Sequence, residues 1–240
     1  AEGSASAIMI LINHASFAYH KKTPIFLKDI NLRIDQGEKV GVLGESGAGK
    51  STLGSIILGQ HIPTKGNIII QSKKVLPIFQ HAIESFDRQY TIQHSLEEPL
   101  NFYRHLKSND IQETVLKYLN KFNLSSHLLK KYPSEVSGGQ LQRFNIIRSL
   151  MAQPDILVCD EITSNLDVFA EQNVINILKE EEEVKSKTII VISHDLSVLQ
   201  RLTQRMIVLK NGKIVDDFVN KDLFSNQRHP YTKLLIQTFE

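Results

Sequence analysis

The sequence predicts an α/β protein with a mainly parallel sheet, an antiparallel β region and a helical subdomain. Short apolar runs bounded by turn residues alternate with helical patterns along much of the chain. The runs at residues 37–44, 154–161 and 187–195 are apolar on both faces, as expected of strands buried in a parallel sheet that helices cover. Between about residues 85 and 152 the strand character is lost, which indicates a helical insertion into the α/β core.

Composition limits the kinds of protein that this chain can be. Its 240 residues suffice for one large domain with a sizeable apolar interior. A net charge of +2 is too small to indicate a nucleic-acid partner, and a single cysteine, Cys159, excludes an internal disulfide and fits a reducing compartment. No apolar run approaches the roughly 20 residues of a membrane span. We interpret residues 1–8, which include AEGSASA, as a remnant of cloning, so that a single domain spans residues 9–240.

A phosphate-binding loop follows the first of these strands. GESGAGKST at residues 44–52 fits G-x-x-x-x-G-K-[ST] and precedes LGSIIL, which predicts a helix, so the strand–loop–helix context that the pattern requires is present. Its backbone N–H groups and the helix N-terminus would bind phosphate, whereas a glycine-rich turn without nucleotide is the simpler alternative. Lys50 would reach the β- and γ-phosphates of ATP, and the Ser51 hydroxyl would bind Mg²⁺. The ATP-binding residues expected here are Gly44, Glu45, Ser46, Gly47, Ala48, Gly49, Lys50, Ser51 and Thr52.

This loop assigns the core, residues 9–84 and 153–240, to the P-loop (RecA-like) class. The helical subdomain at about residues 85–152 divides that core, and its last segment, GGQLQRFNIIRSLMA, has apolar residues at helical spacing. These apolar positions are Leu141, Phe144, Ile147 and Leu150.

The strand at residues 154–161 ends in two carboxylates, Asp160 and Glu161. Acidic residues often end a buried strand simply because water solvates them there, but the phosphate loop upstream favours a catalytic use. Asp160 would hold Mg²⁺ through water. Glu161 would act as the general base that activates the attacking water.

Two features of the C-terminal half concern the fold. The acidic run, Glu180–Glu183, is expected to be a solvated helix end. Within residues 205–217, Asn211-Gly212 stands between two apolar runs and predicts a β-hairpin with a two-residue turn.

A second turn suited to an anion occurs at residues 135–143, EVSGGQLQR. Ser137, Gly138 and Gly139 form a small, flexible turn, and a helix is expected to begin at Gln140 with free N–H groups at its N-terminus. A helix cap without a ligand is the simpler interpretation. The chain already has a phosphate loop, so a second anion site needs an explanation.

The order of the motifs along the chain explains the second anion site, because it resembles the motif order of the ABC-type ATPases. VSGGQLQR is similar to the signature motif of that family, and the resemblance covers residues 9–240. The motifs are, in order, GESGAGKST, FQ at 79–80, the signature, ILVCDE at 156–161, SNLD at 164–167 and ISHD at 192–195. In this family two cassettes pack head to tail, with ATP between the phosphate loop of one and the signature of the other. The resemblance implies that residues 137–140 complete the nucleotide site of a partner cassette.

The resemblance also implies roles for single residues. Tyr19 corresponds to the aromatic residue that stacks on adenine, and Gln80 to the residue that contacts Mg²⁺ and the attacking water. His194 corresponds to the switch histidine, whose imidazole can hydrogen-bond both the γ-phosphate and Glu161. Asp167 belongs to the loop that crosses to the other cassette. The expected metal ligands are Ser51, Gln80 and Asp160.

Several positions depart from the family pattern. Val136 stands where leucine is usual, Asn165 where a small residue is commoner, and His81-Ala82 where Asp-Pro is frequent. The segment at residues 66–80 is short, which indicates a trimmed antiparallel β region. None of these changes removes a catalytic group.

The C-terminal segment DLFSNQRHPYTKLLI at residues 222–236 is similar to the tail of ATPase subunits of peptide/nickel-type importers. That resemblance implies partners: integral-membrane permease subunits, a second and different ATPase subunit, and a separate solute-binding protein. The chain would lie as a peripheral protein on the cytoplasmic face of the cell membrane. Nickel, a metal chelate and a short peptide are the expected solutes, and SEVSGGQLQRF and SNLD are most similar to the nickel or metal-chelate branch.

Two other classes stay open. An ABC-type ATPase without a transporter, acting in repair or translation, usually has two cassettes or a long coiled-coil insert, for which 240 residues are too few. A small-molecule kinase or GTPase would share the phosphate loop, but SGGQ and ISHD argue against it. Copurification with permeases would distinguish the first class, and nucleotide preference with release of free phosphate the second.

Overall fold

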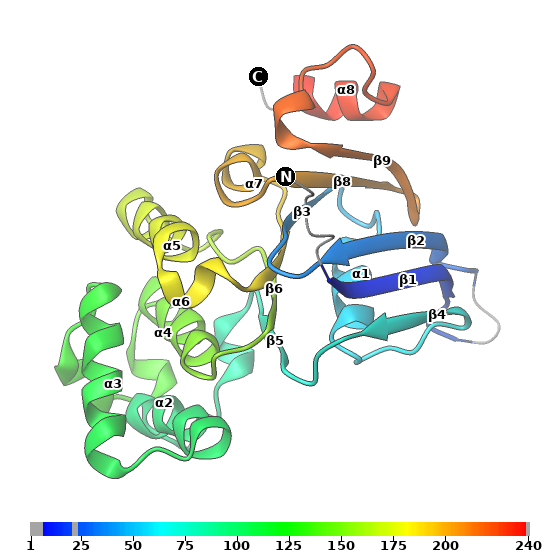
Figure 1. Ribbon diagram of the computed structural model, residues 1–240. Coiled ribbons are helices and arrows are strands. Elements are labelled where there is room, and N and C mark those ends of the chain that lie inside the picture. Colours follow the sequence, from blue (N-terminus) through cyan, green and yellow to red (C-terminus); the bar gives the residue numbers. More distant parts are fainter. Residues whose placement is uncertain (1–6, 21–23, 239–240) are drawn as a thin grey trace, which may run out of the picture. The chain divides into compact units, whose positions relative to one another are not determined.

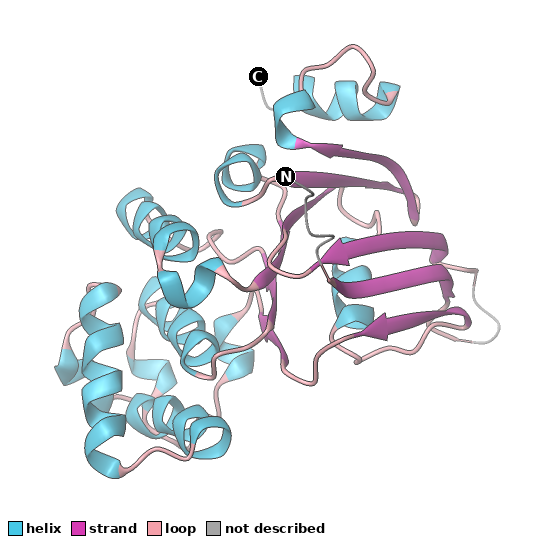
Figure 2. Cartoon of the chain, in the orientation of Figure 1, coloured by secondary structure: helices cyan, strands magenta, loops and turns pink. Residues whose placement is uncertain are grey.

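A six-stranded mixed sheet, a three-stranded antiparallel sheet and a set of helices make up the computed structural model, which describes residues 7–20 and 24–238 (Figure 1, Figure 2). The strands are β1 (Ile8–Phe17), β2 (Leu27–Asp35), β3 (Lys39–Leu43), β4 (Lys65–Ile70), β5 (Val75–Ile78), β6 (Ile156–Asp160), β7 (Thr188–Ile192), β8 (Arg205–Lys210) and β9 (Lys213–Val219). The α-helices are α1 (Lys50–Ile57), α2 (Ile92–Pro99), α3 (Ser108–Lys121), α4 (Gly138–Met151), α5 (Val168–Glu180), α6 (Glu182–Lys185), α7 (Leu196–Leu202) and α8 (Pro230–Gln237). A π-helical turn spans Leu100–Arg104, and 3₁₀ turns span Ala82–Ser85, Ser126–Lys130, Pro133–Glu135 and Asn220–Asp222.

The chain divides into two compact units. The first comprises Ala1–Leu76, Asp155–Asp160 and Ser186–Glu240, and the second comprises Pro77–Pro154 and Glu161–Lys185. All of residues 85–152 belong to the second unit, together with α5 and α6. Residues 1–6 of the expected cloning remnant lie outside the described residues, whereas Ile8 begins β1 and pairs with Asp35. Among the described residues, no helix combines the length and the apolar character that crossing a bilayer requires.

Parallel strands at the centre of the six-stranded sheet confirm the strands that the apolar runs predicted. The sheet order is β5-β6-β7-β3-β8-β9, and β3 is parallel to both of its neighbours, as β6 is to β7. Every residue of β3 and of β7 is buried. Helix α1 contacts β6 and β7, and α7 contacts β3 and β7. Burial on both faces explains why these segments are continuously apolar instead of alternating.

The predicted hairpin is also present, at one edge of this sheet. β8 and β9 are antiparallel, and the two residues that join them, Asn211 and Gly212, have φ values of 50° and 76°. Two positive φ values in succession are what a type I′ turn requires. A Cβ at position 212 would lie 1.8 Å from the carbonyl oxygen of Phe26, so the neighbouring backbone also demands glycine there.

The antiparallel β region is a three-stranded sheet of order β2-β1-β4, as the fold class predicted. Its side chains Ile10, Ile12 and Ile34 belong to the same buried cluster as Val40 and Ile207 of the six-stranded sheet. The two sheets of the first unit therefore share one apolar core, and that core supports the loop after β3.

The second unit is helical, and α4 lies at its core. The four apolar positions predicted to face inward, Leu141, Phe144, Ile147 and Leu150, are all buried. Helix α4 begins at Gly138, earlier than the expected start at Gln140, because Ser137 caps it.

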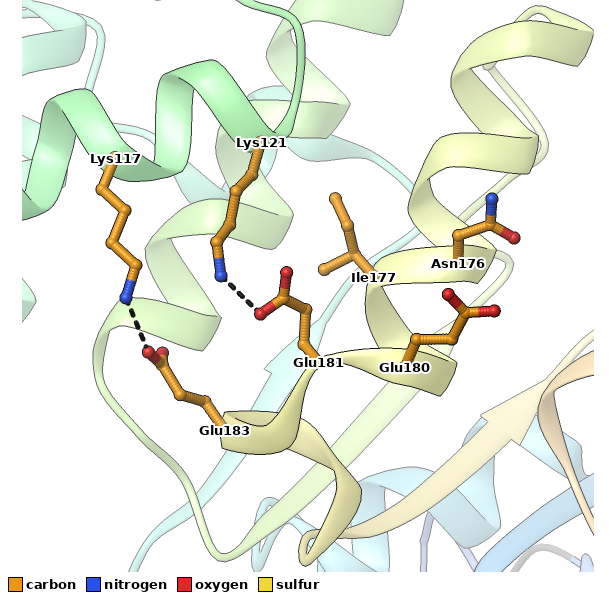
Figure 3. A pocket seen from close by; sticks show the side chains of 7 residues that line it. All are labelled: Lys117, Lys121, Asn176, Ile177, Glu180, Glu181 and Glu183. Atoms are coloured by element: carbon orange, nitrogen blue, oxygen red, sulfur yellow. Dashed lines mark hydrogen bonds and ion pairs between the residues drawn. The ribbon is translucent and has the colours of Figure 1, made fainter.

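The acidic run ends a helix and is partly solvated, as the sequence predicted, because Glu180 and Glu183 are exposed; it also has basic partners that the sequence did not indicate. Lys121 donates a hydrogen bond to Glu181, and Lys117 donates one to Glu183 at 2.9 Å, so the run ties α3 to the ends of α5 and α6 (Figure 3). The Tyr118 hydroxyl also donates to Glu183 at 2.9 Å. The hydrogen bonds from Lys117 and Tyr118 lower the pKa of Glu183. The sequence did not predict these ion pairs, because the basic partners lie on α3, far away in the sequence.

Candidate functional site

Three groups expected to act on a nucleotide follow neighbouring strands of the first unit. The loop at residues 44–52 follows β3, Asp160 ends β6, and His194 comes shortly after β7. The register places both Val42 and Asp160 opposite Ile192. Parallel strands share their carboxyl ends, so the loop, Asp160 and His194 come together at one edge of the sheet, where α/β proteins bind ligands.

The loop has a backbone that approaches its neighbours closely. It begins at Gly44, where a Cβ would lie 2.5 Å from the carbonyl oxygen of Leu209. It leads into α1 through Gly49, whose φ of 108° favours glycine and whose Cβ would lie 2.6 Å from the Leu27 side chain. Gly49 has no side chain with which to cap α1, and the N-terminus of a helix is a favourable place for an anion.

Lys50, the first residue of α1, reaches back to the start of the loop. Its ammonium group donates hydrogen bonds to the carbonyl oxygens of Gly44 at 2.7 Å and of Glu45 at 2.9 Å. These bonds keep a positive charge at the loop, which is where the sequence predicts the phosphates.

Tyr19 lies beside the same loop. Its hydroxyl is hydrogen-bonded to Oγ1 of Thr52 at 2.7 Å. Edge-on contacts with Phe17, Phe26 and His61 orient the ring, at centroid distances of 5.0, 5.4 and 5.6 Å. Tyr19 is 50% exposed, so part of its ring is open to a base. Sequence reasoning found Tyr19 but missed its three supporting rings, which belong to no motif.

The signature residues form the capped start of α4 in the second unit. The Ser137 hydroxyl accepts the N–H of Gln140 at 3.3 Å, and the Gln140 side chain accepts the N–H of Ser137 at 3.0 Å, which makes a capping box. A Cβ at Gly138 would meet no described atom within 4 Å, whereas one at Gly139 would lie 3.3 Å from the carbonyl oxygen of Asn165. The turn is therefore a helix cap within its own chain, and the open space at Gly138 is compatible with a ligand approaching from outside.

The second unit also brings the FQ and SNLD segments to α4. The Asn165 amide donates to the carbonyl oxygen of Gln80 at 3.5 Å. Gln142, in α4, donates to the carbonyl oxygens of Phe79 at 3.4 Å and of Ile162 at 3.2 Å. Sequence reasoning missed Gln142, which is 1% exposed. The sequence carried no signal for it, because Gln142 lies outside the predicted apolar positions of this helix.

Glu161 and Asp167 lie at turns of the second unit. Glu161 has a φ of 49°, an uncommon left-handed conformation for a residue with a side chain. The Ser164 hydroxyl donates to the Glu161 carbonyl oxygen at 2.9 Å and holds this turn. Asp167 caps α5 through its carboxylate, and the next residues, Val168 and Phe169, are 80% and 88% exposed.

Comparisons with known proteins agree with this arrangement of motifs. A family model described as ABC transporter matches residues 27–164. The nickel import system ATP-binding protein NikE of Staphylococcus aureus (strain USA300) is 58% identical over 232 residues, which cover 96% of this chain and 99% of that protein.

Solved structures agree as well. Dimeric MJ0796, a bacterial ABC transporter cassette, aligns with a TM-score of 0.80 at 30% identity and covers 88% of this chain and 99% of that one. MJ0796 in a dimeric post-hydrolysis state bound to ADP and Pi aligns with a TM-score of 0.76 at 27% identity and the same coverage. The family match, the near full-length relative and the shared fold show that this chain belongs to the ABC transporter family, as one of its ATP-binding and ATP-hydrolysing subunits.

Proposed function

We propose that this chain is the ATP-hydrolysing subunit of an importer for nickel, or for nickel bound to a small chelator. The observation that carries this proposal is the 58% identity to NikE over 99% of that protein. The tail RHPYTKLL supports the same group of importers. The proposed partners are integral-membrane permease subunits, a second and different ATPase subunit, and a separate solute-binding protein. The chain would then lie peripherally on the cytoplasmic face of the membrane.

In this proposal the first unit holds the nucleotide. The loop N–H groups and the Lys50 ammonium bind the phosphates, and Tyr19 stacks on adenine. The Ser51 hydroxyl and the Asp160 carboxylate, both in the first unit, are the hard oxygen donors that Mg²⁺ prefers, and α1 contacts β6, the strand that Asp160 ends. These donors fit Mg²⁺, which would supply positive charge to the phosphate oxygens.

The remaining predicted residues act in ATP hydrolysis and in the contact with the partner cassette. Glu161 takes a proton from the attacking water, and His194 hydrogen-bonds the γ-phosphate. Residues 137–140 face the γ-phosphate on a partner cassette, for which the open space at Gly138 leaves room. Asp167 lies in the loop that crosses between cassettes.

Lys50→Ala is expected to weaken ATP binding by about tenfold or more, the effect of losing a charged hydrogen bond, and to leave little hydrolysis. Titration of the purified chain with a fluorescent ATP analogue and an assay of phosphate release measure both quantities. Lys213→Ala, which removes an equal charge from the exposed start of β9, is the control. Normal binding and hydrolysis by Lys50→Ala would rule out the phosphate-loop assignment.

The importer proposal is tested by nickel uptake in cells that lack the gene for this chain. We expect uptake of radioactive nickel to fall to background and to return with the wild-type chain but not with Lys50→Ala. Dipeptide uptake, measured in parallel, should not change, and tagged chain should copurify with permease subunits. Unchanged nickel uptake, or a fall in dipeptide uptake instead, would show that nickel is not the solute. Purification without any permease would favour an ABC-type ATPase that has no transporter.

A further inference from the structure

The C-terminal tail reaches the phosphate loop, a contact that no sequence motif indicated. Tyr231, in the first turn of α8, is 5% exposed, and its hydroxyl accepts the backbone N–H of Glu45 at 3.3 Å. Glu45 is the second residue of the loop, and Tyr231 belongs to the RHPYTKLL segment. Both residues lie in the first unit, so this contact is internal to one compact body.

The contact holds one particular peptide group. The carbonyl of Gly44 and the N–H of Glu45 belong to the same planar peptide unit. The Lys50 ammonium donates to that carbonyl at 2.7 Å, and Tyr231 accepts from that N–H. A rotation of the peptide would break both bonds together, and each bond polarises the peptide in favour of the other. The orientation of this peptide therefore helps to place the charge of Lys50, which the carbonyl oxygen of Glu45 also holds at 2.9 Å.

The tail that carries Tyr231 is itself anchored to β9 through Asp216. The Asp216 carboxylate accepts hydrogen bonds from the Arg228 guanidinium at 3.2 Å and from the N–H of His229 at 2.9 Å. The side chains of Arg228 and Asp216 are each 11% exposed, and the guanidinium lies 4.2 Å from the ring centroid of Phe218. Nδ1 of His229 then accepts the N–H of Tyr231 at 3.1 Å and starts α8. Such an anchor fixes the Tyr231 backbone to the sheet.

The Tyr231 ring is held as firmly as its backbone. The Lys210 ammonium lies 4.4 Å from the ring centroid, within the range of a cation–π contact. Burial raises the pKa of Tyr231, so its hydroxyl stays neutral and able to accept the Glu45 N–H at physiological pH.

We propose that the RHPY segment at residues 228–231 is a positioning element of the nucleotide site. Tyr231 holds the Gly44–Glu45 peptide, and through it Lys50, in the orientation that meets the phosphates of ATP. The inference rests on the proposed function of the loop. Tyr231 is a positioning residue, because it contacts the loop backbone and acts on the nucleotide only through Lys50.

Tyr231→Phe tests this proposal, because it removes the hydroxyl and keeps the ring. We expect the affinity for Mg²⁺-ATP to weaken, and KM for ATP to rise, by about fivefold, the effect of one lost hydrogen bond. We expect kcat to stay within about twofold, because the bond is made before ATP binds and is not specific to the transition state. Affinity is measured by displacement of a fluorescent ATP analogue from the full chain, and the kinetic constants are measured on the chain assembled with its permease subunits.

Tyr118→Phe is the matched control. Tyr118 is likewise 5% exposed, and its hydroxyl also makes a hydrogen bond, to Glu183 in the second unit. This variant should lose stability in thermal denaturation without any change in ATP affinity or KM. An equal loss of affinity in Tyr118→Phe would mean that general destabilisation is responsible, and would overturn the proposal.

Asp216→Asn provides a second test that leaves Tyr231 in place. Loss of the carboxylate charge weakens the anchor on Arg228 and His229, so KM should rise with kcat nearly unchanged. The double variant with Tyr231→Phe should raise KM little further than either single change, because both changes act on the same contact. Wild-type affinity and KM in the folded variants would overturn the proposal. If the tail variants bind ATP as the wild type does, Lys50→Ala distinguishes the two hypotheses. Normal ATP binding by Lys50→Ala would then rule out the proposed function of the loop. Weak ATP binding by Lys50→Ala would rule out only the proposed role of the tail.

Discussion

Glu161→Gln is expected to abolish ATP hydrolysis while ATP binding stays intact. An amide has nearly the shape of the carboxylate but does not take a proton from water at neutral pH, and a general base typically contributes about 10²–10⁴-fold to the rate. The phosphates are held by the loop and by Lys50, which this change does not touch. Phosphate release should therefore fall by about two orders of magnitude or more, and the affinity for the fluorescent ATP analogue should stay near that of the wild type.

Where the chain forms homodimers, the same variant should accumulate as a dimer in the presence of ATP. In the head-to-tail arrangement ATP joins the two cassettes, and a variant that does not cleave it keeps them joined. Size-exclusion chromatography with light scattering, with and without ATP, measures this directly. Glu180→Gln makes the same chemical change at the exposed end of α5 and should behave as the wild type does. Near-normal hydrolysis by Glu161→Gln would show that another group is the base.

Gly138→Asp should abolish dimerisation and hydrolysis but spare ATP binding by the same chain. The isolated chain should tolerate the new side chain, because a Cβ at this position meets no described atom within 4 Å. In the dimer the carboxylate would face the γ-phosphate on the partner, and like charges placed together cost several kcal/mol, which is a loss of about a hundredfold or more. Tyr19 and the loop, both in the first unit, should bind ATP as before.

Mixing this variant with Lys50→Ala gives the sharper result. In a mixed dimer, one composite site has the loop of the Gly138→Asp chain and the signature of the Lys50→Ala chain, and is intact. The other site has both lesions. Where the chain forms homodimers, hydrolysis should return in the mixture although each variant alone is inactive. Loss of ATP binding in Gly138→Asp itself would mean that the signature serves its own nucleotide, and the head-to-tail assignment would be wrong.

Local chemistry in the sequence was sufficient for much of the fold. A run such as KVGVL, apolar on both faces, is stable only when both faces are buried, and β3 is indeed covered on both. Asn211-Gly212 predicted a hairpin, because these residues tolerate positive φ at low cost. The strand, loop and helix around GESGAGKST were likewise predictable, because each is set by residues within a few positions of one another.

Contacts between distant segments were not predictable in the same way. Gln142 looked like an ordinary polar residue of a helix, yet it is buried and binds the backbone at Phe79 and Ile162. The acidic run is partly solvated, as predicted, but nothing in the sequence indicated its partners on α3. In each case the side chain alone gives no sign of which distant group will satisfy it, because that depends on how the chain folds back on itself.

By itself, then, the sequence determined which segments form the sheet, which loop meets phosphate, and which family the motifs resemble, since all of these follow from short-range patterns. Only the tertiary structure decided that Tyr231 accepts the N–H of Glu45, and that Asp216 anchors the tail that carries it. The physical reason is that a hydrogen bond needs its two atoms within about 3 Å of each other, and for residues so far apart in the chain only the packing of β8, β9 and α8 brings them there.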